Sequence, residues 1–355
     1  MSIELLEKLS NAAGISSFEQ EIVTIMEEAV QELPVQTYRD GLGSFISCTK
    51  EYCSGPKIMV AGHMDEVGFI VKEIDEHGYL RLQPVGSLWT HLLLDHSFDV
   101  ICDNQARIEG LIGSVAQHGI SAKVRNTTLA MKDLYLDLGL YTREEVEKLG
   151  IHIGNQVVPS TRFHRLNRED IYVGKAMDNR LGCYIALEVL RNCQSISHPK
   201  YYAVGNVQEE PGLRGARTAT EVIQPDLAFA IDTTTAGDTP LNRNTVKLGQ
   251  GLVISLIDSN TIAHRGLIRY MEETCRKYGI PYQYALFKAG GTDAGNIHKT
   301  RQGIISMCLS IPVRYMHASQ TIVSYQDVQA CIDLLTKVVE EMNDELLEKI
   351  AKGGY

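Results

Sequence analysis

Apolar residues along the first 85 positions predict a helical start that gives way to strands. Within the first 35 residues they recur every three or four positions, as on one face of a helix, and the clearest set is Ile22, Ile25, Met26, Ala29 and Leu33. Ser16 and Glu19 have the spacing of a capping box, which predicts a helix start at this point. From residue 35 onward the pattern favours strands: two joined by a turn at residues 40–41, then three between residues 57 and 85 with a turn near residues 77–78.

The pattern changes twice further along the chain. Between about residues 67 and 164, short β-like runs such as FDVICD and GLIGSVA are separated by turns, and the helical period is found only near TREEVEKLG. From residue 171 onward helices and strands alternate, and the chain closes with a helical stretch over residues 324–350. Such alternation is typical of helices packed against a largely parallel sheet. We therefore predict an α/β fold in which residues 1–67 and 165–355 form one domain, interrupted by an inserted β-rich module over residues 68–164.

Five apolar runs are followed by, or lead into, an acid or an imidazole. In an open α/β sheet, binding sites gather at the carboxyl ends of the strands. Each residue alone has an ordinary structural interpretation, such as a helix cap for Asp178 or a solvated strand end for Glu209 and Glu210. Their coincidence favours a shared site. The full set is His63, Asp65, Asp178, Glu209, Glu210, Asp232 and His317.

This set of side chains suits a pair of divalent metal ions. Two histidines, two aspartates and a glutamate can hold two metals roughly 3.5–4 Å apart, with a short aspartate as the bridge. Asp65, two residues beyond His63, is placed to accept the second N–H of that imidazole and so fix its tautomer. Five ligands leave one glutamate unused, and a free carboxylate beside a metal-bound water is what general-base hydrolysis requires.

Composition and charge exclude several other classes of protein. The chain has 355 residues, of which 44% are hydrophobic and 22% charged, as in a globular protein with a sizeable core. Its net charge of -10 argues against nucleic acid and anionic membranes as main partners. The N-terminus lacks the apolar stretch of a signal peptide, and no run approaches the roughly 20 residues of a membrane span. The 8 cysteines form no CxxC pair, which favours a reducing compartment and predicts a cytoplasmic protein.

Six short motifs, in order along the chain, closely resemble those of the glutamyl, deblocking and tetrahedral aminopeptidase family of co-catalytic di-metal peptidases. They are GHMDEVGF, KAMDNR, VQEEPGLRGA, AIDTTTAGDTP, GGTDAG and RYMHASQT. The resemblance extends from about residue 14 to residue 321. It implies that His63 and Asp232 bind one metal, that Glu210 and His317 bind the other, and that Asp178 bridges the two.

The same resemblance implies an activity and two further roles. Glu209 would be the general base and Asp65 would orient His63, so that the protein removes N-terminal residues from peptides through a metal-activated water. The cofactors would be two divalent ions per subunit, with zinc foremost and cobalt or manganese as alternatives, because mixed carboxylate and imidazole ligands accept several metals. The preferred N-terminal residue stays open: an acidic one would need a cation in the pocket, for which Lys288 and Arg314 are candidates.

The family's fold also matches the pattern of the chain. It implies a three-layer α/β/α metallopeptidase domain with a mixed, largely parallel sheet, and a barrel-like dimerisation domain as the insertion. Homo-oligomers, dimers that assemble into dodecamers around a chamber, would admit peptides and exclude folded proteins. The sequence departs from the family at Leu241, where glycine is common, at Asp95–His96, and in the short segment over residues 113–126. These departures leave the ligand set intact and concern the assembly.

Two other functions are compatible with parts of the sequence. A di-metal hydrolase could act on another amide or on a glycoside, although a glycosidase ordinarily needs two carboxylates and no metal ligands. A non-catalytic chamber or binding protein could keep the metals for structure alone. Glu209 argues against that function, because a structural metal site is closed and has no use for a free base.

Overall fold

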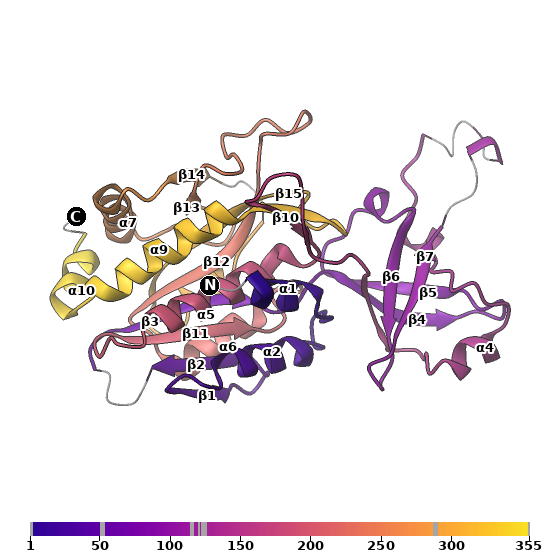
Figure 1. Cartoon of the computed structure of the whole chain (residues 1–355), viewed down its shortest axis with the longest axis horizontal. Helices are drawn as coiled ribbons and strands as arrows, with labels where there is room; N and C mark the ends of the chain where they lie inside the picture. Colours follow the sequence, from indigo (N-terminus) through magenta and orange to yellow (C-terminus); the bar gives the residue numbers. More distant parts are fainter. Residues whose placement is uncertain are drawn as a thin grey trace.

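Two β-sheets organise the chain (Figure 1). The computed structural model describes residues 3–49, 54–113, 117–119, 121, 126–286 and 290–353. Within these residues the larger sheet has 11 strands and the smaller has 5. No helix among them is long and apolar enough to cross a membrane.

The larger sheet is mixed, with a parallel centre. Neighbouring strands β11, β3, β12 and β15 run parallel, and so do β13 and β14, whereas the other pairs are antiparallel. In spatial order the strands are β1 (Val35–Arg39), β2 (Phe45–Thr49), β11 (Lys200–Asn206), β3 (Lys57–His63), β12 (Leu227–Thr235), β15 (Ile305–Arg314), β16 (Thr321–Ser324), β10 (Ile171–Gly174) and β9 (His164–Arg165), with β13 (Leu252–Ile257) pairing β15 and β14 (Tyr282–Leu286).

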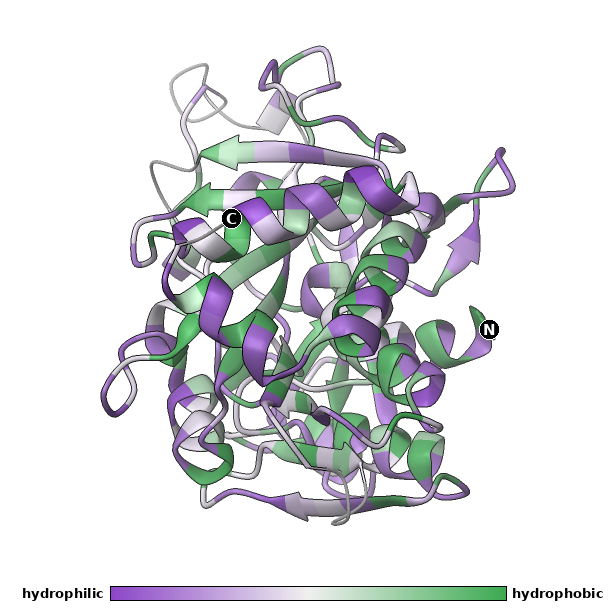
Figure 2. Ribbon diagram, turned by 90° about the vertical axis from the view of Figure 1, so that its left-hand side faces the viewer, coloured by the Kyte–Doolittle hydropathy of each residue, from purple (hydrophilic) through white to green (hydrophobic). Residues whose placement is uncertain are grey.

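Helices cover both faces of this sheet because its central strands are apolar on both sides. On β3, Ile58 and Val60 belong to one hydrophobic cluster, and the alternate residues Met59 and Ala61 belong to another. The first cluster is shared with α1 (Ile3–Asn11), α2 (Gln20–Val30), α5 (Met177–Asn192), α7 (Arg265–Tyr278), α9 (Tyr325–Glu341) and α10 (Asp344–Ala351), and the second with α6 (Arg214–Ile223) and α8 (Ala294–Ile297). Figure 2 shows helices that carry both hydrophilic and hydrophobic residues. The predicted α/β fold with a mixed sheet is confirmed.

The smaller sheet is antiparallel and is formed entirely within the predicted insertion. Its order is β5 (Leu80–Val85), β4 (Gly68–Ile74), β8 (Gln156–Pro159), β6 (His96–Ile101) and β7 (Arg107–Ile112), accompanied by α4 (Arg143–Lys148) and the short turns η1 (Thr90–Leu92), η2 (Gln117–Gly119) and η3 (Met131–Asp133). The buried apolar residues of its own cluster all come from residues 69–157. That the module is a separate domain, barrel-like and used for dimerisation, stays a prediction.

Two local expectations at the chain ends are wrong. Glu19 stands at the start of α2 without a side-chain cap hydrogen bond among the described residues, and Ser16 donates to Asp65 instead, so the predicted capping box does not form. The predicted C-terminal helical stretch divides after Glu341, and Asn343 caps the second helix by accepting from the N–H of Leu346. Strand β13 was not expected from the sequence.

Candidate metal centre

The predicted site residues converge at the carboxyl edge of the larger sheet. His63 ends β3, and Asn206, its neighbour in the parallel register, ends β11 just before Glu209 and Glu210. Asp232 lies on the next strand, β12, and His317 follows β15. Because these four strands are adjacent and parallel, their carboxyl ends meet at one edge.

Asp178 lies between the two histidines. Its Oδ1 is 3.3 Å from Nε2 of His63, and its Oδ2 is 3.1 Å from Nε2 of His317. Potential ligand atoms of His63, Asp178 and Asp232 all lie within 4.8 Å of one another, and so do those of Asp178, Glu210 and His317. The two groups share Asp178 alone, which is the arrangement that a bridging carboxylate would have.

The backbone at the start of α5 explains why Asp178 faces the site. Asp178 and Asn179 have non-helical φ/ψ angles of -84°/101° and -131°/42°. Asn179 takes over the capping role, since its Oδ1 accepts from the N–H of Gly182 at 3.0 Å, and its Nδ2 donates to the carbonyl of Ile231 at 2.6 Å. The carboxylate of Asp178 is therefore free of the capping role that was its ordinary structural interpretation.

Asp65 contacts His63 and also holds the glutamate pair. Nδ1 of His63 is 3.0 Å from the backbone oxygen of Asp65 and 3.4 Å from its Oδ1, so the backbone carbonyl is the nearer partner of the ring. The buried carboxylate accepts from the hydroxyl of Ser16 at 2.6 Å and from the backbone N–H groups of Glu209 and Glu210 at 3.0 and 3.2 Å. Asp65 thus ties the segment after β3 to the segment after β11.

Burial and crowding shift the pKa values of these side chains. Burial raises the pKa of Glu209 well above its usual range, and it raises the pKa of Glu210 to about 7. Burial alone would lower the pKa of His63, but Glu209, Asp178 and Asp65 outweigh it and raise that pKa well above its usual value. Burial alone would also lower the pKa of His317, but the contact with Asp178 outweighs it and raises that pKa to about 9. The site therefore concentrates negative charge that needs positive partners.

The donor set fits divalent metal ions. Oδ1 of Asp178 and Oε1 of Glu210 are buried and have no hydrogen-bond partner within the described part of the chain. Buried carboxylate oxygens without partners are costly unless a cation satisfies them. Imidazole nitrogens and carboxylate oxygens are also the ligands that zinc and related metals take in hydrolases.

A cavity of about 530 Å³ opens over these residues. Its walls include Ser87, Leu213, Thr233–Thr235, Asn244, Asp258, Asn260, Gly290–Thr292 and Met316. The glycine loop fits closely here, because a Cβ on Gly291 would lie 2.1 Å from Nδ2 of Asn260. Part of the GGTDAG motif is therefore a wall of the site, and the cavity has room for a small peptide end.

The candidate cations for a specificity pocket are not seen in that role. Arg314 forms a two-point ion pair with Asp238, with its Nε 3.0 Å from Oδ1 and its Nη2 2.7 Å from Oδ2. The guanidinium of Arg314 is therefore engaged by Asp238. Lys288 lies outside the described residues.

The sequence interpretation missed two groups of residues beside the site. Asn206 donates to Oδ2 of the buried Asp293 at 2.7 Å, beneath the glutamate pair. Glu66, Lys175 and Arg180 form a buried ion-pair network next to the ligands. Both groups lie inside or beside the quoted motifs, and that proximity was the available signal.

Buried imidazoles and carboxylates that gather at the carboxyl edge of an α/β sheet are typical of metal-dependent hydrolases. Residues 43–334 match the profile of the M42 glutamyl aminopeptidases. The chain belongs to this family of metal-dependent aminopeptidases, as its motifs predicted.

Individual relatives cover almost the whole chain. FrvX of Escherichia coli K12, a candidate aminopeptidase, is 38% identical over 340 residues, or 94% of each chain. The lysyl aminopeptidase of Pyrococcus furiosus is 32% identical, over 96% of this chain and 97% of its own length. The glutamyl aminopeptidase of Lactococcus lactis is 31% identical, over 98% of this chain and 99% of its own length.

Solved structures agree with the sequence relatives. The TET aminopeptidase of a marine sediment archaeon of the Thaumarchaeota superposes with a TM-score of 0.94 at 32% identity, covering 98% of this chain and 99% of its own. The TET1 peptidase of Pyrococcus horikoshii can assemble into a tetrahedron or a large octahedral shell. Its structure has a TM-score of 0.83 at 27% identity, and the match covers 96% of this chain and 99% of its own.

Proposed function

We propose that the protein is an aminopeptidase that binds two metal ions, with Asp178 as a ligand of both. His63 and Asp232 would hold one ion, Glu210 and His317 the other, and Asp178 both. The observation that supports this proposal is that two groups of ligand atoms have only Asp178 in common. Zinc is the foremost candidate, with cobalt or manganese as alternatives. Bound there, divalent ions polarise a carbonyl and lower the pKa of water.

Glu209 is the general base in this proposal. It belongs to neither of the two groups that share Asp178, although its ligand atom lies within 4.8 Å of those of His63 and Glu210, which form a third group with it. Its Oε2 is 3.9 Å from Nε2 of His63, and it lines the same cavity. Its carboxylate would take a proton from the attacking water and deliver it to the leaving amine. Asp65 would hold Glu209 in place through the hydrogen bond that its carboxylate accepts from the backbone N–H of Glu209.

The substrates we propose are peptides with a free N-terminus. The relatives named glutamyl and lysyl aminopeptidase differ in the charge of the residue removed, so the family does not select one side chain. We also propose that the chain forms homo-oligomers, dimers that assemble into a dodecamer, because TET relatives assemble into a dodecamer, a tetrahedron or an octahedral shell. The cysteines without a CxxC pair support a location in the cytoplasm. Light scattering after size exclusion would measure the mass.

Matched glutamate variants would test the mechanism. Aminoacyl p-nitroanilides with acidic, basic and apolar residues are assayed with the native protein, a chelated sample, and the variants Glu209→Gln and Glu210→Gln. We expect chelation to abolish turnover and added metal to restore it. Glu209→Gln should lower kcat by about 10²- to 10⁴-fold with metal still bound, whereas Glu210→Gln should weaken metal binding itself.

Glu188→Gln is the control, since Glu188 is a buried glutamate of α5 that pairs with Arg191. It should leave both turnover and metal content unchanged. Hydrolysis that survives chelation, or full turnover in Glu209→Gln, would contradict the mechanism. A protein that binds metal but cleaves no aminoacyl substrate would contradict the activity.

A further inference from the structure

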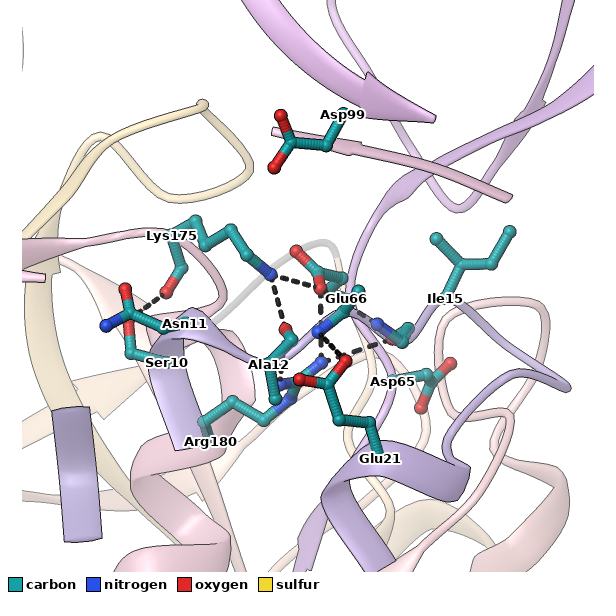
Figure 3. A network of polar contacts seen from close by, with 12 residues as sticks. Ser10, Asn11, Ala12, Ile15, Glu21, Asp65, Glu66, Asp99, Lys175 and Arg180 are labelled. Atoms are coloured by element: carbon teal, nitrogen blue, oxygen red, sulfur yellow. Dashed lines mark hydrogen bonds and ion pairs between the residues drawn. The ribbon is translucent and has the colours of Figure 1, made fainter. Parts of the chain in front are cut away.

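Glu66, Lys175 and Arg180 form a buried network of charged side chains (Figure 3). Oε1 of Glu66 is 2.5 Å from Nζ of Lys175 and 3.2 Å from Nη2 of Arg180. The side chains of Lys175 and Arg180 are 0% exposed and that of Glu66 is 2% exposed. One carboxylate oxygen thus joins two cations in the interior.

The network connects the two segments that carry Asp178 and His63. Lys175 and Arg180 flank Asp178 in the chain, three residues before it and two residues after it. Arg180 donates through Nε to the carbonyl of Met64, the residue after His63, at 2.6 Å. Glu66 follows Asp65 directly, so its ion pairs close a second link between the same two segments.

The N-terminal segment is bound into the same network. Lys175 donates to the carbonyl of Ala12 at 2.6 Å, and Arg180 donates to that of Leu9 at 2.6 Å. The backbone N–H of Gly14 donates to Oε1 of Glu66 at 3.2 Å. Among the described residues, the donors to this carboxylate oxygen therefore come from two segments, residues 175–180 and the N-terminal segment.

The composition of this network suggests a role beyond stability. Burying charges carries a desolvation cost, and well-packed apolar residues often replace a buried ion pair with no loss of stability. What such a network supplies is a fixed geometry, because each partner has directional bonds to several segments. Here the segments that it fixes carry His63 and Asp178, whose facing atoms are 3.3 Å apart.

We propose that Glu66, Lys175 and Arg180 are positioning residues that hold the segment of His63 at a set distance from Asp178 and so determine the affinity for metal ions. The inference rests on the proposed function in taking those two residues as ligands. It assigns no contact with the metal or substrate to the network itself.

Two substitutions of Glu66 separate position from charge. Glu66→Gln keeps the size and removes the charge, whereas Glu66→Asp keeps the charge and is one methylene too short to reach Lys175, Arg180 and Gly14 together. Zinc alone is titrated into chelator-treated protein by calorimetry, after circular dichroism has shown that each variant is folded. We expect both variants to bind zinc about 10- to 100-fold more weakly than wild type, as other supporting residues of metal sites do.

The matched controls are Glu188→Gln and Glu188→Asp on α5, the helix that carries Arg180. Glu188 is equally buried and pairs with Arg191, and we expect both controls to bind zinc within about twofold of wild type even where the melting temperature falls. With saturating zinc, the Glu66 variants should recover most of kcat at unchanged KM, since the machinery itself is intact.

The outcomes separate this inference from the proposed function. Wild-type protein that binds none of zinc, cobalt and manganese would overturn both. Wild-type binding together with near-wild-type affinity in a folded Glu66→Asp would overturn the positioning role and leave the proposed function standing. An equal loss of affinity in the Glu188 variants would also overturn it, because a general loss of stability would then explain the effect. If Glu66→Gln fails to fold, Glu66→Asp carries the comparison.

Discussion

At the scale of single residues, buried carboxylates in this protein are compensated in three different ways. Those at the sheet edge gather around Asp178, which faces the imidazoles of His63 and His317. Glu66 is paired with a lysine and an arginine. Asp327, at the start of α9, accepts the backbone N–H groups of Gly249 and Gly251, each at 2.7 Å. Of these three cases, only Asp327 lacks a positively charged partner among the described residues, so nothing offsets the desolvation of its ionised form except backbone N–H groups.

Asp327 should therefore make stability depend on pH. Burial raises the pKa of its carboxyl group to about 7, whereas in the unfolded chain it is about 3.9. Between those values the folded state holds a proton that the unfolded state does not, so stability is lost as pH rises. The stability advantage of wild type over Asp327→Asn should shrink by about 1.6 kcal/mol between about pH 5.5 and pH 7.

Urea unfolding of both proteins across this range, with a chelator present, measures that difference. Subtracting the variant cancels the titration of the acids at the site, which both proteins share. A gap between the two proteins that does not change with pH would show that Asp327 has an ordinary pKa in the folded state.

The sequence predicted which polar residues lie at strand ends better than it predicted pairings over long distances. His63, Glu209, Glu210 and Asp232 could be placed at the edge of the sheet because an acid or imidazole that follows an apolar run is visible locally, whereas their roles stay a prediction. Ser16 was interpreted as a local helix cap because the spacing to Glu19 allows one, whereas its actual partner, Asp65, is 49 residues away. Pairings over such distances leave no local pattern to read.

At the scale of elements, the close contact between β3 and α5 brings His63 and Asp178 together. A Cβ on Gly62 would lie 2.3 Å from the backbone carbon of Gly182, so the strand and the helix meet through two glycines without side chains between them. The sequence indicated both elements from their periods, but their separation depends on this pair. The same contact brings Asn179 within reach of β12, where it donates to Ile231.

Gly62→Ala should disturb both stability and the site. The added methyl group would clash with helix backbone, which cannot rotate away, and overpacking of this kind costs about 1–3 kcal/mol. We expect a loss of roughly 2 kcal/mol or more in the free energy of unfolding, and weaker zinc binding because His63 moves with the strand. Gly41→Ala is the control, since a Cβ there meets nothing within 4 Å. Equal stability of the two variants would exclude the proposed close contact.

At the scale of the whole molecule, each sheet has its own hydrophobic core, and a smaller apolar cluster joins the two cores. The core of the smaller sheet comes from residues 69–157, and the two large clusters around the larger sheet come from residues outside that range. The contact between them contains Ala13, Ile15, Ile101 and Val158. The change in the apolar pattern between residues 67 and 164 predicted β-rich structure there, and the smaller sheet lies within those bounds, while its status as a separate domain stays a prediction. The contact combines residues too far apart for any period to reveal.

Removing the inserted module should leave a folded metal-binding domain. Phe69 and Val157 are direct partners in the antiparallel ladder of β4 and β8, so a short Gly/Ser turn can replace residues 70–156. We expect the shortened chain to unfold cooperatively at a lower temperature, because Ala13 and Ile15 lose part of their cover. Zinc titration should still show binding, since the ligands lie outside the deletion. Light scattering should show a monomer where the full chain forms an oligomer, because assembly is the role predicted for the module. An aggregated or unfolded product would mean that the two cores depend on each other, whereas an oligomer of unchanged subunit number would place assembly on the larger sheet and its helices.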